Sequence, residues 1–240
     1  MIYFCFCIQQ LYPMPFPCPE KDATVDINSA VETTNWLPQG LHYLLPPLVQ
    51  PNMRKLGLAG HSRGGKAAFA LALKKEATIL KFSALIGIDP VDGMQDGTPI
   101  PPPVTTLPYP FQLDMPVMVI GTELGEMGKH CCCCTLPATA PEGINHEDFF
   151  RKCEKPACHL VAKDYGHCDM LDDKICCIYE LLMCLCFNSG NSRKPMRRFV
   201  GGAIVAFMKA YLLGDNSDLM AIRDETLTPP VVLKTKEFLE

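Results

Sequence analysis

The chain has 240 residues, of which 48% are hydrophobic and 20% charged, a balance typical of a folded domain with a sizeable core. A net charge of −4, with no basic run longer than Arg197-Arg198, excludes the usual electrostatic surface for nucleic acid. Fourteen cysteines are too few for a disulfide scaffold of this length, so we expect most of them to be buried in a reducing compartment. Residues 1–240 are therefore predicted to form a single domain.

The first predicted elements lie before residue 60. The aromatic run from Ile2 to Ile8 is typical of a strand that enters a proline-rich stretch, and an unstructured end is the alternative. Apolar residues at helical spacing predict a helix over 26–37, which Pro38 is expected to close. The start of the chain has no basic segment, so neither a signal peptide nor a transit peptide is recognised.

Beyond residue 54, short apolar runs alternate with helical segments. A strand is predicted over 55–59 and a helix, rich in alanine, leucine and lysine, over 66–77. Further buried strands are predicted over 82–88, 117–120 and 159–162. The apolar segment 199–213 is too short to span a bilayer and predicts a buried helix. This order predicts an α/β fold, a mostly parallel sheet flanked by helices, with functional residues at the carboxyl ends of the strands.

A proline-rich loop separates two of these strands, with six prolines between residues 99 and 110. Proline cannot donate to a strand ladder, so we expect the loop to run over the surface. Two interpretations remain open at this point: a stiff wall or lid over an apolar substrate, and a plain connection.

The strongest motif is Gly60-His61-Ser62-Arg63-Gly64, which fits the nucleophile elbow Gly-x-Ser-x-Gly. It lies between a predicted strand and a predicted helix, where the glycines would permit a tight backbone turn. We therefore predict Ser62 as a nucleophile. The N–H of Arg63, at the positive end of the following helix, is predicted to be one donor to an oxyanion.

A serine nucleophile requires a base and an orienting acid, which in this fold follow it in the order acid, histidine. Of the four histidines after Ser62, His167 is favoured because it follows the last predicted strand by a few residues. His159 should be buried inside that strand, whereas His130 and His146 belong to a loop-rich stretch with no strand to hold them.

The acid is predicted to be Asp89, at the end of the strand that follows the nucleophile helix. Glu123, just after the next strand, is the runner-up. Asp92 is more remote from its strand, while Asp164 and Asp169 lie too near the histidine in sequence to face it easily.

Cysteine clusters raise the question of a metal. The run 131–134 beside His130 cannot direct consecutive side chains at one ion, and Cys153, Cys158 and His159 have no second matching pair. We expect no metal site.

Several segments resemble the chlorophyllase family of plant ester hydrolases. They comprise 59–66 around Ser62, 82–91 ending in Asp-Pro-Val, Asn145-His146-Glu147, 164–173 around His167, and 196–202. The resemblance covers most of the chain from about Asp26 to its end.

The resemblance implies an α/β-hydrolase with a triad of Ser62, Asp89 and His167, no cofactor, and hydrolysis of chlorophyll to chlorophyllide and phytol. It also implies the chloroplast, with the cytosol or an endomembrane surface as alternatives, and it is compatible with peripheral membrane association. No obligate protein partner is evident. A general carboxylesterase for other hydrophobic esters and an inactive remnant that only binds pigment remain alternative functions.

The resemblance also implies a departure at the N-terminal end. The family has a longer N-terminal half, with early strands and a loop that supplies a second oxyanion N–H, and only 61 residues precede Ser62 here. We expect a truncated chain whose sheet lacks N-terminal strands and has a gap beside the strand that leads to Ser62.

Overall fold

The computed structural model describes residues 5–8, 22–93, 97–131, 134–172 and 192–240. Among these residues, six strands form one sheet in the order β1-β2-β3-β4-β7-β8. The strands are β1 (Cys5–Ile8), β2 (Leu56–His61), β3 (Phe82–Ile88), β4 (Val117–Thr122), β7 (Ala157–Ala162) and β8 (Leu233–Leu239). All neighbouring pairs are parallel except β7 with β8, which is antiparallel. This arrangement is the predicted α/β-hydrolase-like fold.

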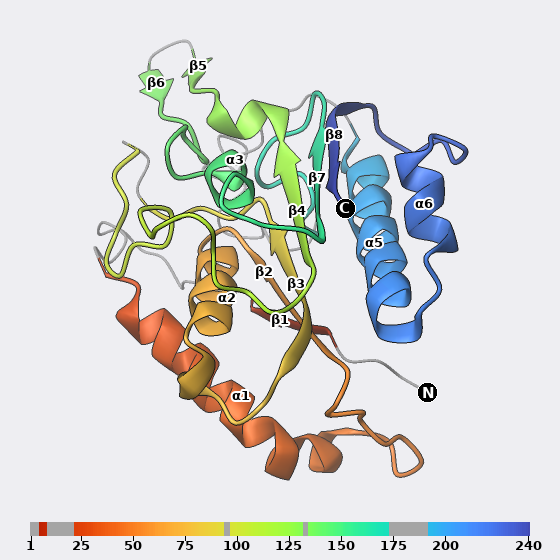
Figure 1. Cartoon of the computed structure of the whole chain (residues 1–240). Helices are drawn as coiled ribbons and strands as arrows, with labels where there is room; N and C mark the ends of the chain where they lie inside the picture. Colours follow the sequence, from red (N-terminus) through yellow and green to blue (C-terminus); the bar gives the residue numbers. More distant parts are fainter. Residues whose placement is uncertain (1–4, 9–21, 94–96, 132–133, 173–191) are drawn as a thin grey trace.

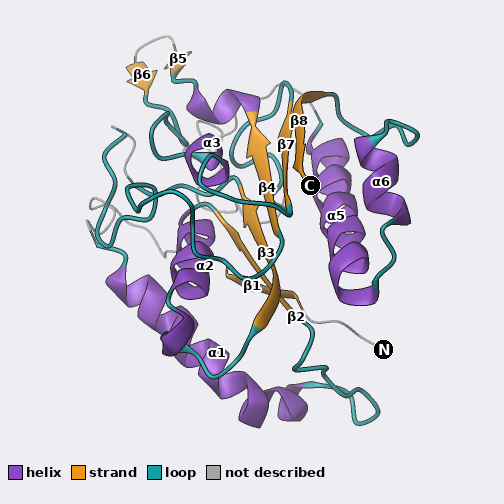
Figure 2. Ribbon diagram, in the orientation of Figure 1, coloured by secondary structure: helices purple, strands orange, loops and turns teal. Residues whose placement is uncertain are grey.

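Helices cover both faces of the sheet (Figures 1 and 2). The helices are α1 (Thr24–Leu44), α2 (Arg63–Leu73), α3 (His146–Phe150), α5 (Arg193–Met208) and α6 (Ser217–Arg223). One apolar cluster joins the sheet to α1, α2 and α3, and another joins it to α5 and α6. None of the helices in the described part of the chain is long and apolar enough to cross a bilayer.

The strands predicted after residue 54 are confirmed as β2, β3, β4 and β7. They could be recognised as apolar runs because most of their residues are buried on both faces of the sheet. Every residue of β4 and β7 is buried, and β2 is buried up to its last residue. The helix predicted over 66–77 begins earlier, at Arg63, and its α-helical part ends at Leu73, with a short 3-10 turn at Lys75–Ala77.

Helix α1 runs past the proline that was expected to end it. Pro38 lies inside the helix, and Leu37 and Leu41 on either side of it are both buried. Burial of the same apolar face on both sides of the proline outweighs the one backbone hydrogen bond that a proline removes.

The gap expected beside β2 is not present. β1 pairs directly with β2 in parallel, with Cys5 opposite Gly57 and Ile8 opposite Gly60. The backbone groups along that side of β2 therefore have a partner strand, which satisfies the requirement that buried N–H and C=O groups be paired.

The stretch expected to hold no strand contains a small hairpin. β5 (Lys129–Cys131) pairs antiparallel with β6 (Cys134–Leu136), so His130 lies in a strand, and His146 begins α3. Residues 132–133 of the cysteine run and the segment 173–191 lie outside the described residues.

Candidate active site

Ser62 stands on a strained turn between β2 and α2. Its φ of 57° and ψ of −128° are values that side-chain-bearing residues rarely adopt. The turn needs glycine at position 60, because a Cβ there would lie 2.1 Å from the carbonyl oxygen of Gly64. The motif thus folds as the strand, tight turn and helix that its sequence predicted.

Two hydrogen bonds connect Ser62 to His167 and His167 to Asp89. The Nε2 of His167 lies 2.8 Å from the Oγ of Ser62, and its Nδ1 lies 2.9 Å from the Oδ2 of Asp89. Asp89 directly follows β3, and His167 lies in the loop after β7. With Nδ1 protonated and bonded to the carboxylate, Nε2 presents its lone pair to the serine hydroxyl. The structure therefore brings together the three residues selected from the sequence.

Thr122, at the end of β4, is a second partner of the Asp89 carboxylate. Its hydroxyl donates to Oδ2 at 2.6 Å and its N–H donates to Oδ1 at 3.3 Å, and both residues are fully buried. Burial alone would raise the pKa of Asp89. The hydrogen bonds from His167 and Thr122, together with the nearby charges of His167 and His146, outweigh burial and lower that pKa. Asp89 is thus an ionised acceptor.

His61 holds the loop that carries His167. Its Nε2 lies 2.9 Å from the carbonyl oxygen of His167, and the two rings are 4.7 Å apart between centroids. Burial, with the charge of His167 adding to it, lowers the pKa of His61 to about 4. The ring is therefore neutral near pH 7 and donates Nε2–H to that carbonyl.

The other acidic candidates have different partners. Glu123 accepts the backbone N–H of Asp164 at 3.0 Å and lies 3.6 Å from the Nζ of Lys234. Asp92 forms a buried ion pair with Lys66 of α2. Asp169 accepts the N–H of Gly166 at 2.7 Å. The described contacts join only Asp89 among the acidic candidates to the imidazole of His167.

The other buried histidines pair with each other. The Nδ1 of His146 lies 2.9 Å from the Nε2 of His159, and both rings are buried, as expected for His159. A Cβ on Gly121 would lie 2.4 Å from the His146 ring, so that ring packs directly on the backbone of β4. His159 lies in β7 and His146 begins α3, and the hydrogen bonds of the described residues join neither to Ser62.

Arg63 lies at the start of α2, where backbone N–H groups have no partner within the helix. A negative oxygen bound next to Ser62 would meet this positive end of the helix. The side chain of Arg63 forms a 2.8 Å ion pair with Asp26 of α1, which ties the elbow to the neighbouring helix. The role of the Arg63 N–H in binding an oxyanion stays a prediction.

Thr122 and His61 were not identified as functional residues from the sequence. His61 occupies a variable position of the elbow motif, and Thr122 is the last residue of β4, two residues beyond the predicted end of that strand. Their roles depend on distances between segments about 30 and 100 residues apart. Within the described residues, no three His, Cys, Asp or Glu side chains are placed to hold a metal ion.

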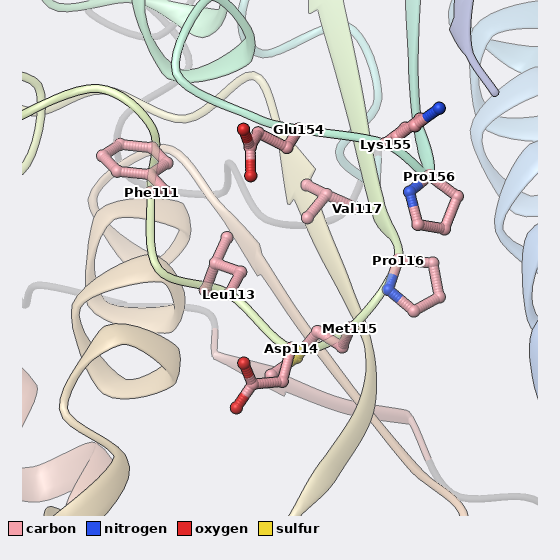
Figure 3. A pocket seen from close by; sticks show the side chains of 9 residues that line it. All are labelled: Phe111, Leu113, Asp114, Met115, Pro116, Val117, Glu154, Lys155 and Pro156. Carbon is pink, nitrogen blue, oxygen red and sulfur yellow. The ribbon is translucent and has the colours of Figure 1, made fainter.

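A surface pocket lies away from this site (Figure 3). It is lined by Phe111, Leu113, Asp114, Met115, Pro116, Val117, Glu154, Lys155 and Pro156. Val117 is the first residue of β4 and Pro156 precedes β7, so the pocket is at the amino ends of these strands. Asp89 and His167 follow the carboxyl ends of their strands, at the opposite edge of the sheet.

The fold and this arrangement at the carboxyl ends of the strands define an α/β-hydrolase-like protein. The family model described as Chlorophyllase matches residues 4–240, and the chain belongs to the chlorophyllase family. It is 51% identical to Chlorophyllase-2 of Arabidopsis thaliana over 220 residues. The matched region covers 90% of this chain and 67% of the relative. It is 41% identical over 225 residues to Chlorophyllase-1, chloroplastic, of Citrus sinensis, and that match covers 92% of this chain and 65% of the relative. The chain thus spans about two thirds of the length of these relatives.

Proposed function

We propose that this chain is a single α/β-hydrolase domain that hydrolyses the phytyl ester of chlorophyll to chlorophyllide and phytol, within the chloroplast. The observation that carries the proposal is the line of hydrogen bonds from Ser62 Oγ through His167 to Asp89. The family match and the name of the Citrus relative support the substrate and the compartment.

The chemistry is transfer of an acyl group in two steps. His167 Nε2 accepts the proton of Ser62 as Oγ attacks the propionate carbonyl carbon, and the carbonyl oxygen becomes an oxyanion facing the N–H of Arg63. The imidazolium, held by Asp89, gives that proton to the phytol oxygen as the ester bond breaks. Water then attacks the acyl-enzyme, with His167 again taking and returning a proton, and releases chlorophyllide.

Asp89 has two tasks in this scheme. Its carboxylate fixes the imidazole with Nδ1 protonated, and it stabilises the positive charge that develops on the ring. The low pKa of Asp89 keeps it ionised throughout the neutral range.

A serine-directed fluorophosphonate tests the mechanism and the substrate together. We expect a single phosphonylated peptide that contains Ser62, protection of that serine by excess chlorophyll, and no label on Ser62→Ala. Absence of label on a folded protein would contradict the nucleophile. Labelling without protection by chlorophyll, but with protection by a small ester, would favour a general carboxylesterase.

A further inference from the structure

A fully buried ion pair lies one helical turn beyond Ser62. Lys66 of α2 and Asp92 both have side chains with 0% exposure, and Nζ lies 3.0 Å from Oδ1 of Asp92. Nζ also donates to the carbonyl oxygens of Asp92, at 2.9 Å, and of Ile100. Each of the three ammonium protons therefore has an acceptor. Burial lowers the pKa of Lys66, and the Asp92 carboxylate opposes that effect.

Ile100 belongs to the proline-rich loop, and the other carboxylate oxygen of Asp92 accepts hydrogen bonds from a second part of that loop. Oδ2 accepts the N–H of Val104 at 2.9 Å, the N–H of Thr105 at 2.7 Å and the hydroxyl of Thr105 at 2.7 Å. The ion pair thus fixes two points, at Ile100 and at Val104-Thr105, in the proline-rich loop, defined here as residues 97–110.

This loop is connected to the nucleophile elbow through Asp92. The N–H of Val91, just before Asp92, donates to the carbonyl oxygen of Ser62 at 3.1 Å. On the other side, the N–H of Ala23 donates to the carbonyl oxygen of Pro101 at 2.7 Å, and Ala23 leads into the helix that pairs with Arg63. The loop therefore bonds directly to the residue before α1, at Ala23, and reaches Ser62 through Asp92 and Val91.

The loop also carries exposed apolar side chains. Ile100 and Val104 point into the core, whereas Leu107 and Tyr109 are 38% and 66% exposed. Its prolines restrict the backbone on either side of the ion pair. A loop of this kind can offer a hydrophobic group a fixed surface at little cost in conformational entropy.

The Lys66–Asp92 ion pair is better explained by the loop conformation that it holds than by a contribution to the stability of the fold. Removing two charges from water costs about as much as their attraction returns, so a buried pair adds little net stability. We propose that Lys66 and Asp92 are positioning residues that hold the proline-rich loop as a fixed wall beside Ser62, and that this wall favours esters with a long apolar group. The inference rests on the proposed ester hydrolysis at Ser62.

The test compares three variants with the unaltered chain on three substrates. The double variant Lys66→Met/Asp92→Leu removes both charges without leaving one buried alone. Thr105→Val removes one bond to Asp92 and is the milder second variant. Lys75→Met removes an exposed ion pair with Asp114 and is the matched control. The substrates are p-nitrophenyl acetate, p-nitrophenyl laurate and chlorophyll a.

For the double variant we expect kcat/KM on the laurate and on chlorophyll to fall about tenfold or more through KM, with the acetate changed less than about twofold. Thr105→Val should shift the laurate-to-acetate ratio in the same direction, and Lys75→Met should leave it unchanged. Hydrogen exchange should show lost protection at the amides of Val104 and Thr105 in the double variant.

An equal loss on all substrates, or an unchanged laurate-to-acetate ratio in folded variants, would overturn the proposal. Retained protection at both amides would also overturn it, and this readout does not require activity. If the unaltered chain cleaves p-nitrophenyl esters but not chlorophyll, the chlorophyll assignment alone fails and the laurate-to-acetate ratio still tests the wall. If the double variant does not fold, Thr105→Val decides by the same ratio.

Discussion

Replacing Asp89 by asparagine should abolish most of the turnover while preserving the shape of the site. The Oδ2 of Asp89 accepts from His167 at 2.9 Å and from the Thr122 hydroxyl at 2.6 Å, and Oδ1 accepts from the Thr122 N–H. An asparagine amide has only one oxygen. Its NH2 group would therefore face either the N–H of Thr122 or the Nδ1–H of His167, and two donors cannot form a hydrogen bond. The imidazole would then adopt the tautomer with Nε2 protonated, which cannot take the serine proton.

The expected loss in kcat is about 10³- to 10⁴-fold, equivalent to about 4–5.5 kcal/mol of transition-state stabilisation. It combines the wrong tautomer with the missing negative charge beside the imidazolium. The assay is kcat for p-nitrophenyl acetate, with thermal unfolding of each variant to confirm the fold.

Glu123→Gln is the matched control, because Glu123 also follows a strand end but contacts Asp164 and Lys234 instead of His167. Its kcat should change less than about threefold, as is usual for substitutions outside the reacting groups. A larger loss in Glu123→Gln than in Asp89→Asn would assign the acid to Glu123 and refute the reasoning.

Three further predictions concern the surroundings of the site. Thr122→Val removes a hydroxyl that donates to the Asp89 carboxylate, so kcat for p-nitrophenyl acetate should fall about tenfold, and a change below twofold would contradict this. Gly60→Ala should lower the free energy of unfolding in urea by about 1–3 kcal/mol, whereas Gly201→Ala, whose Cβ meets nothing within 4 Å, should not lower it; equal effects would contradict the tight turn. Burial lowers the pKa of His61 to about 4 and of His159 to about 3, so from about pH 6.5 down to 4 the unfolded state binds more protons. Stability in urea titrations should therefore decrease as pH falls, by up to about 1.4 kcal/mol per unit for each histidine, and a flat profile would contradict their burial.

The parallel strands could be predicted because they are buried on both faces and read as continuous apolar runs. β8 could not, since its residues alternate between half-buried and exposed and include Lys234, Lys236 and Glu237. The continuation of α1 past Pro38 and the pairing of β1 with β2 depend on tertiary packing, which local sequence does not encode.

Within the site, Asp89 and His167 could be predicted because parallel strands bring their carboxyl ends to one edge of the sheet. Thr122 and His61 could not, because each acts through hydrogen bonds to a residue distant in sequence. The buried partner of Lys66 was equally invisible, since Asp92 was considered only as a possible acid. Local motifs thus indicated the candidate reacting residues, whereas the residues that contact them required the structure.

The most direct test of the proposed function is cleavage of chlorophyll a by the purified 240-residue chain and by its Ser62→Ala variant, followed as release of chlorophyllide. Our account predicts cleavage by the unaltered chain and none by the variant, with nearly the same thermal unfolding for both. A folded chain that releases no chlorophyllide, or a Ser62→Ala variant that releases it at the same rate, would contradict the account.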